Sequence, residues 1–366
     1  MKQFTLFAVL TISTLGGLAQ EPPTYKPADF KEGDVPKGMT AEEYMRQVYE
    51  ERHYKIKVTF RVVGEDGMPI PDADIDVGID SLLHADGHNN YRGKTDAEGL
   101  FTVESRGRGC TDVLVEKTGY YPSRPEVQWD GDLNPGGEEM HQNGGFRPWN
   151  PTIDVVLKKV GNPIPMLVRR GNRCRNSIGP TDDQLSKEIG WDLIAGDWVA
   201  PHGAGTTADL LVRFESDFID ESNRSASAVI RFGNPDDGLI PIPELRGESS
   251  LLKFPRIAPE AGYDLRKLEF SQRTKDGALV ITPDENLEGY FTRLRTETDE
   301  EGNVQSALYG KVTNPFELLE NVFRGRSHLF LKFDYYLNLT PNDRNLEYDQ
   351  KNNLAPETDK DLRWPP

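Results

Sequence analysis

The chain alternates apolar and polar side chains through residues 55–62, KIKVTFRV, and this stretch decides its fold. Ile56, Val58 and Phe60 point to one face of such a strand, and the intervening polar side chains point to the other. The same period of two returns in residues 74–80, DIDVGID. Strands with one apolar face bury it by packing as two sheets. We therefore expect a β-sandwich to begin at residue 55.

Three further motifs follow in order. Residues 63–70 read VGEDGMPI, residues 95–101 read TDAEGLF and residues 113–120 read VLVEKTGY. Together they resemble a carboxypeptidase regulatory-like (transthyretin-like) domain that covers residues 55–160. The resemblance implies a seven-stranded, immunoglobulin-like sandwich that serves as a structural or adhesive accessory module and has no catalytic residues of its own. Residues 121–150 are a long insertion relative to that family.

The second half, residues 161–366, is also predicted to be β-rich. Residues 290–296 and 304–313 flank an acidic, Gly-containing turn, a pattern typical of a hairpin. The stretches GDWV, SALYGK and YYLN resemble the second half of a group of uncharacterised exported bacterial proteins, which join it to the same regulatory-like domain. That resemblance covers nearly the whole chain and implies no particular activity. These stretches are residues 196–199, 306–311 and 335–338.

Two short helices are expected beside the strands. Thr40 and Glu43 form a capping box, and apolar residues recur at helical spacing from there to about Arg52. Residues 315–323 are predicted to form a second helix, because their three largest apolar side chains would share one face. The expected fold class is thus all-β: an N-terminal seven-stranded sandwich, a second β-rich domain and a short N-terminal helix.

The N-terminus has the pattern of an export signal. Lys2 precedes an apolar run, residues 4–15, and small residues stand at Gly17 and Ala19, ahead of cleavage before Gln20. We expect residues 1–19 to be a signal peptide and residues 20–54 to be an extended arm followed by the helix. No later segment reaches the ~20 apolar residues of a transmembrane helix. The prediction is an exported protein, periplasmic or extracellular.

The chain is acidic, with 60 Asp and Glu against 43 Lys and Arg and a net charge of −17. Such a field repels nucleic acid and anionic membranes, so neither is expected as a partner. Residues 158–176 are a local exception, a cationic strip that we expect neighbouring carboxylates to neutralise. The alternative is that the strip binds an acidic polysaccharide or a phosphate. Its cations are Lys158, Lys159, Arg169, Arg170, Arg173 and Arg175.

Two candidate sites follow from the residue types. In an oxidising compartment Cys110 and Cys174, the two cysteines, are candidates for one disulfide; two separate thiols are the alternative. Asp130, Asp132 and Asn134 alternate as the oxygen ligands of a calcium loop do. The calcium loop lacks its usual Gly, which is replaced by Pro, so calcium is a weak candidate and no other cofactor is expected.

Motifs of known catalytic chemistry are incomplete. Residues 202–205, HGAG, resemble the oxyanion loop of esterases, but no G-x-S-x-G elbow accompanies them. Ser250 and Lys253 fit S-x-x-K without its partner motifs. Residues 84–88, HADGH, offer three ligand types in what is predicted to be a surface loop. We therefore expect no enzyme activity.

The function predicted is that of an exported, non-catalytic binding or structural protein of the cell surface or periplasm. A surface polysaccharide or another exported protein is the partner class considered. One alternative is a polysaccharide or peptide hydrolase with its site in residues 180–340, which would show a cleft lined by close carboxylates. Another is a small-ligand carrier, which would need an enclosed apolar pocket. The oligomeric state is not predicted.

Residues 340–366 are too polar to fold alone. They are expected to leave the strand around residues 329–338 and to wrap the second module. In that arrangement Arg344 would pair with a carboxylate, and Leu346 and Tyr348 would anchor the segment. The alternative is a free recognition tail.

Overall fold

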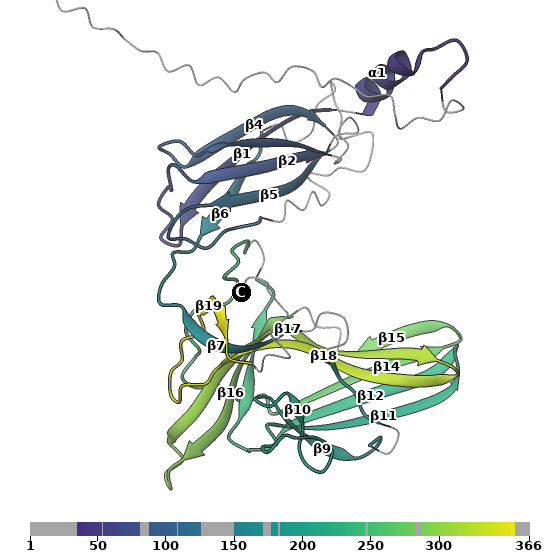
Figure 1. Cartoon of the computed structure of the whole chain (residues 1–366), viewed down its shortest axis with the longest axis vertical. Coiled ribbons are helices and arrows are strands. Elements are labelled where there is room, and N and C mark those ends of the chain that lie inside the picture. The colour runs from purple at the N-terminus through teal and green to yellow at the C-terminus, as the bar shows by residue number, and fades with distance from the viewer. Residues whose placement is uncertain are drawn as a thin grey trace, which may run out of the picture.

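The structure is a computed structural model of the chain. Within the residues it describes, the chain is all-β apart from one helix, α1 (Ala41–Arg52), and the strands form two sandwiches, one above the other in Figure 1. The described helix is far too short and polar to cross a membrane. The described residues are 35–52, 54–80, 88–107, 109–125, 150–170, 177–181, 184–245, 248–282 and 287–355.

Helix α1 begins with the predicted capping box. The backbone N–H of Thr40 donates to Oε2 of Glu43 at 2.8 Å, and the N–H of Glu43 donates to Oγ1 of Thr40 at 3.2 Å. Two N–H groups that the first turn would leave without partners are satisfied in this way. The predicted N-terminal helix is therefore confirmed.

The N-terminal sandwich consists of two three-stranded sheets, in the orders β4-β1-β6 and β3-β2-β5. β1 and β6 run parallel, and the other neighbours are antiparallel. Six strands are thus described where seven were predicted, and residues 126–149 of the long insertion lie outside the described residues. The strands are β1 (Tyr54–Gly64), β2 (Asp74–Asp80), β3 (His88–Lys94), β4 (Leu100–Gly107), β5 (Cys110–Glu116) and β6 (Thr152–Leu157).

The predicted register of this sandwich is confirmed. The two sheets enclose one apolar core, and every side chain expected to point inward is at most 2% exposed. Alternation alone was enough here because each strand has one face on the core and one in water. The confirmed inward residues are Ile56, Val58, Phe60, Ile75, Val77 and Val115.

The C-terminal sandwich pairs a six-stranded sheet, β10-β9-β11-β12-β14-β15, with a seven-stranded sheet, β13-β16-β17-β18-β7-β19, in which β8 also pairs with β18. Its main core lies between the two sheets. The strands are β7 (Ile164–Arg169), β8 (Ser177–Ile178), β9 (Glu188–Asp192), β10 (Asp197–Trp198), β11 (Leu210–Asp220), β12 (Asn223–Phe232), β13 (Gly238–Pro243), β14 (Lys267–Lys275), β15 (Ala278–Thr282), β16 (Leu287–Thr298), β17 (Val304–Phe323), β18 (Arg326–Asn338) and β19 (Tyr348–Asn353).

The helix predicted for residues 315–323 is wrong. These residues continue β17, which pairs with β18 as far as Phe323↔Arg326. Phe316 and Leu318 are both 7% exposed and lie two positions apart, as strand residues on one face do. The hairpin predicted for residues 290–313 is present as β16 and β17. Pairing with a neighbouring strand therefore decided the conformation against the local helical spacing.

The segment after β18 reaches the main core at Ala355, but its earlier residues pack on the outer face of the seven-stranded sheet. Leu346 is fully buried there and Tyr348 is 6% exposed, in a second, outer core. β19 then pairs in parallel with β7. Arg344 was expected to meet a carboxylate, but it donates to the carbonyl oxygen of Ala258 at 3.0 Å. Residues 356–366 lie outside the described residues.

The two sandwiches are joined by backbone pairing. Ser123 of the N-terminal sandwich and Ser250 of the C-terminal sandwich form an isolated antiparallel bridge. The N–H of Arg124 donates to the carbonyl oxygen of Ser249 at 2.8 Å, and the N–H of Leu251 donates to that of Pro122 at 2.9 Å. The junction therefore has the hydrogen bonding of a short piece of sheet.

Glu347 is the polar centre of this junction and is 1% exposed. Its carboxylate accepts from the N–H of Gly161 (2.7 Å), the N–H of Asn162 (2.8 Å) and the hydroxyl of Tyr121 (3.0 Å). Arg256 lies beside it and makes two hydrogen bonds, of 2.7 and 2.9 Å, to Glu65 of the N-terminal sandwich. We call these four residues together with Arg256 and Glu65 the junction cluster.

Candidate functional site

Two cations of the cationic strip, Lys158 and Arg169, bind groups inside the protein. Lys158 pairs with Glu248 at 2.6 Å and also donates to the carbonyl oxygen of Leu252 at 2.7 Å. Arg169 is 5% exposed and donates to the carbonyl oxygens of Ile194 and Ala195 at 3.1 and 2.7 Å. The expected neutralisation by a carboxylate thus holds for Lys158, and Arg169 binds two backbone oxygens. Arg173 and Arg175 lie outside the described residues.

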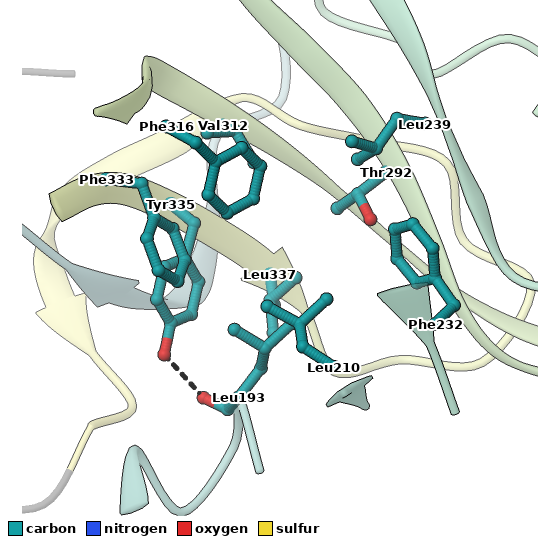
Figure 2. A pocket seen from close by; sticks show the side chains of 10 residues that line it. All are labelled: Leu193, Leu210, Phe232, Leu239, Thr292, Val312, Phe316, Phe333, Tyr335 and Leu337. Atoms are coloured by element: carbon teal, nitrogen blue, oxygen red, sulfur yellow. Dashed lines mark hydrogen bonds between the residues drawn. The ribbon is translucent and has the colours of Figure 1, made fainter. Parts of the chain in front are cut away.

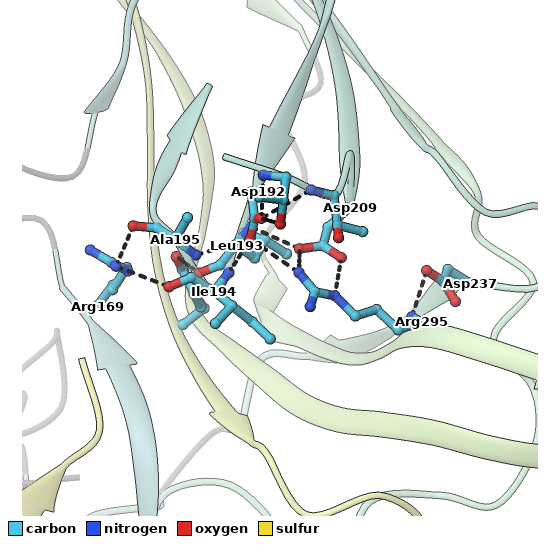
Figure 3. Close-up of polar contacts among 11 residues, drawn as sticks. Arg169, Asp192, Leu193, Ile194, Ala195, Asp209, Asp237 and Arg295 are labelled. Carbon is cyan, nitrogen blue, oxygen red and sulfur yellow. Dashed lines mark hydrogen bonds and ion pairs between the residues drawn. The ribbon is translucent and has the colours of Figure 1, made fainter. Parts of the chain in front are cut away.

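Three buried aspartates converge on one arginine in the C-terminal sandwich (Figure 3). Asp192 ends β9, Asp209 precedes β11 and Asp237 precedes β13, and each is at most 2% exposed. Arg295 reaches them from β16, at a point where the register with β17 shifts and its own φ is 52°. We call these four residues the aspartate cluster.

Arg295 links the aspartates directly. Its Nε and Nη2 donate to the two oxygens of Asp209 at 2.9 and 3.0 Å, and Nη2 also donates to Asp192 at 3.0 Å. The backbone N–H groups of Arg295 and Thr296 both donate to Asp237 at 2.9 Å. A side chain that is only 30% exposed thus neutralises two buried carboxylates.

The surroundings shift the aspartate pKa values in different directions. Burial pushes the pKa of Asp192 up, but N–H donors from Ala195, Thr206 and Thr207 outweigh it, and the net pKa is lowered. Burial dominates for Asp209 and Asp237 and raises both pKa values, against the hydrogen bonds that they accept. The three aspartates accept hydrogen bonds from backbone N–H groups and from Arg295. In this way they hold three loops in place.

The sequence did not single out this cluster. Its members are spread over more than a hundred residues, and aspartates before and after strands are common in so acidic a chain. The one local signal is the stretch Asp192-Leu193-Ile194-Ala195. The Asp192 side chain accepts from the N–H groups of Ile194 and Ala195, as the first residue of a turn typically does.

A small apolar cavity lies between the two sheets of the C-terminal sandwich (Figure 2). Phe316, Phe333 and Tyr335 bound one side of it, with Leu210 and Leu337 among the other lining residues. Its volume is about 10 Å³, which is about the size of one water molecule. The hydroxyl of Tyr335 donates to the carbonyl oxygen of Leu193 at 2.7 Å. This space is a packing gap in the core and is too small for an organic ligand.

The candidate sites of the sequence are only partly described. Asp130, Asp132 and Asn134 lie outside the described residues, as does Cys174, so the calcium loop and the disulfide stay predictions. Cys110 is buried in β5, where burial raises the pKa of its thiol to about 12. Among the described residues, no group of three or more His, Cys, Asp or Glu side chains is placed to hold a metal ion.

An apolar strand lies on the surface. All five residues of β15 are exposed, and Leu279, Val280 and Ile281 are 55%, 62% and 55% exposed. β15 is the last strand of the six-stranded sheet and pairs with β14 alone among the described strands (Figure 1). Exposed apolar edge strands are rare in soluble proteins, because they invite pairing with another chain.

Fold and surface together define an all-β protein of two joined sandwiches. No family model and no curated protein matches the chain. The assignment of residues 55–160 to the carboxypeptidase regulatory-like family therefore stays a prediction.

Three solved structures show distant likenesses. A 3-chlorocatechol 1,2-dioxygenase from Rhodococcus opacus is 16% identical, with a TM-score of 0.21 over 29% of this chain and 60% of that one. A shaft pilin SpaA from Lactobacillus rhamnosus is 11% identical (TM-score 0.18; 76% and 93% covered). A DUF3823 family protein from Bacteroides ovatus is 8% identical (TM-score 0.17; 77% and 97% covered). TM-scores this low do not establish a common fold, so the class of protein rests on its own sheets.

Proposed function

We propose that this chain is an exported, non-catalytic protein of the cell surface or periplasm that acts by binding through its surface. The observation that carries the proposal is β15, an apolar strand that is exposed along its whole length at the edge of a sheet. Contiguous exposed apolar surface of this kind commonly marks the place where a protein binds a partner. A surface polysaccharide or another exported protein is the partner class.

The hydrolase alternative needs carboxylates that a substrate can reach. The three aspartates of the aspartate cluster are close carboxylates within residues 180–340, but each is at most 2% exposed and is bound to Arg295 or to backbone N–H groups. A glycosidase carboxylate must approach the scissile bond from a cleft. The arrangement of the aspartates thus favours a structural role.

The carrier alternative needs an enclosed pocket of several hundred Å³. The apolar cavity of the C-terminal sandwich has a volume of about 10 Å³ and is lined mainly by aromatic and aliphatic side chains. The junction cluster adds support for a structural or binding role, because it couples the two sandwiches through buried hydrogen bonds. A coupled pair of modules presents its surfaces in a set orientation.

A turnover assay tests the proposal. The full chain is incubated with neutral and acidic bacterial polysaccharides and with casein, and new reducing ends and free amino groups are measured. We expect neither to appear. Turnover that Asp192→Asn abolishes would contradict the proposal and support a hydrolase built on the aspartate cluster.

A further inference from the structure

The neighbours of β15 explain why its side chains are exposed. Leu279 and Ile281 are opposite Thr274 and Gln272 of β14, whose side chains are buried, so they lie on the inner face of the sheet. An inner-face residue is normally covered by the opposite sheet. Leu279 and Ile281 are nevertheless both 55% exposed, so the opposite sheet leaves them uncovered.

The opposite sheet ends at β17 in this region. β16 pairs with β17 from Val304 to Val312, whereas β18 accompanies β17 as far as Phe323. From residue 314 to residue 323, β17 therefore has a described partner strand on its β18 side alone. Gln272 of β14 reaches this edge and donates to the carbonyl oxygen of Leu318 at 3.2 Å. β15 lies one strand beyond that contact, with uncovered apolar side chains on both of its faces.

The edge lacks the devices that usually protect such strands. Residues 278–282, ALVIT, contain no charge, no proline and no glycine. Natural edge strands are commonly protected by an inward lysine, a proline or a bulge. The pairing of β15 with β14 is regular over all five residues. An open edge of this kind offers both backbone hydrogen-bonding groups and apolar side chains, which is what an incoming strand requires.

Charge near the edge indicates the chemistry of the occupant. Arg273 is opposite Val280 and Lys275 is opposite Ala278, so both cations lie on the outer face beside β15, and both are exposed. Asp276, in the turn between β14 and β15, is the acidic residue nearest to them in sequence. A second copy of the chain would bring the same two cations to the same face. Acidic side chains on the incoming strand would instead be attracted by them.

We propose that β15 binds an extended strand of another exported polypeptide, in which apolar residues alternate and acidic residues flank them. The inference rests on the proposed binding function and names its partner class. The incoming strand continues the six-stranded sheet beyond β15. Its apolar side chains cover Leu279 and Ile281, and its acidic side chains approach Arg273 and Lys275.

A fluorescent peptide tests this proposal on the full chain. The probe has nine residues, with valine and threonine alternating and two acidic residues at each end, and binding is followed by anisotropy. We expect saturable binding that Leu279→Ser with Ile281→Ser weakens at least tenfold. Met68→Ser, which changes an equally exposed apolar side chain of the other sandwich, is the matched control and should leave the affinity unchanged.

Two further measurements complete the test. Arg273→Ser with Lys275→Ser should weaken binding of the acidic probe several-fold and leave a probe with serine at its ends unaffected. Hydrogen exchange of the wild-type chain should slow at residues 278–282 when the probe binds, which requires no variant to fold.

Failure to bind, or equal binding by wild type and Leu279→Ser with Ile281→Ser, would overturn the proposal. Dimerisation of the wild type that this double variant abolishes in sedimentation velocity would overturn it too, in favour of a second copy. None of these results changes the outcome of the turnover assay. Failure of the strand-binding proposal can therefore be told apart from failure of the proposed function.

Discussion

Lys311 of β17 is a buried lysine in the outer core, with its Nζ above the rings of Tyr336 (4.9 Å) and Phe254 (5.8 Å). Its pKa is lowered to about 7, chiefly by burial and also by the positive charge of Arg170, while the carboxylate of Glu347 opposes the shift. The native protein thus keeps this side chain largely neutral above neutral pH.

The consequence is a pH-dependent stability. An unfolded lysine has a pKa of about 10.4, so between about pH 7 and 10 the unfolded chain binds a proton that the native chain does not. Stability therefore rises with pH in this window, by about 1.4 kcal/mol per pH unit at most, and this contribution is least favourable below pH 7. We expect Lys311→Met to be more stable than wild type near pH 7, with a difference that shrinks toward pH 10. Urea unfolding of both proteins across the window measures it, and a constant difference would contradict a neutral Lys311.

Gly99 occupies a position where a side chain would cause both backbone strain and a steric clash. Its φ is 74°, and a Cβ atom would lie 2.5 Å from the carbonyl oxygen of Val62. Gly302 has a similar φ, 84°, but open space around it. We expect Gly302→Ala to lose about 1 kcal/mol of unfolding free energy and Gly99→Ala about 3 kcal/mol or more. Equal losses in urea unfolding would show that the close approach to Val62 has no energetic weight.

β17 shows how an element is decided by its partner. Phe316 lies in the main core, 4.4 Å from Phe333 between ring centroids, whereas Phe323 is 59% exposed near the end of the strand. A helix would have placed both side chains on one face. We expect Phe316→Ala to lose about 3 to 5 kcal/mol and Phe323→Ala less than about 1 kcal/mol. Similar losses would favour the helical spacing, and chemical denaturation of the two variants decides between them.

At the scale of the whole molecule, the junction cluster couples the sandwiches. Tyr121 and Glu65 belong to the N-terminal side, and Glu347 and Arg256 to the C-terminal side. We expect the wild type to unfold in one calorimetric transition. The double variant Tyr121→Phe with Arg256→Ala should unfold in two transitions, because each substitution removes hydrogen bonds that cross the junction.

Arg61→Ala is the matched control for that experiment. Arg61 also makes a two-bond ion pair, at 2.6 and 2.7 Å to Asp154, but within the N-terminal sandwich. This variant should keep the single transition. Two transitions in the wild type, or one in the Tyr121→Phe with Arg256→Ala variant, would show that the junction does not couple unfolding.

Local patterns in the sequence determined the capping box of α1, the strands of the N-terminal sandwich and the inward set that includes Val58 and Val115. These features depend on neighbours within a few residues, or on an alternation that every strand with one buried face must show. The all-β class followed from them.

Tertiary structure alone decided the rest, because burial depends on what lies opposite a residue and not on the residue itself. Residues 315–323 have helical spacing but extend along β18, since cross-strand pairing satisfies their backbone. Asp192 and Arg295 meet from positions far apart in the chain. The same apolar alternation that buries Ile75 leaves Ile281 exposed, because no opposite sheet covers Ile281.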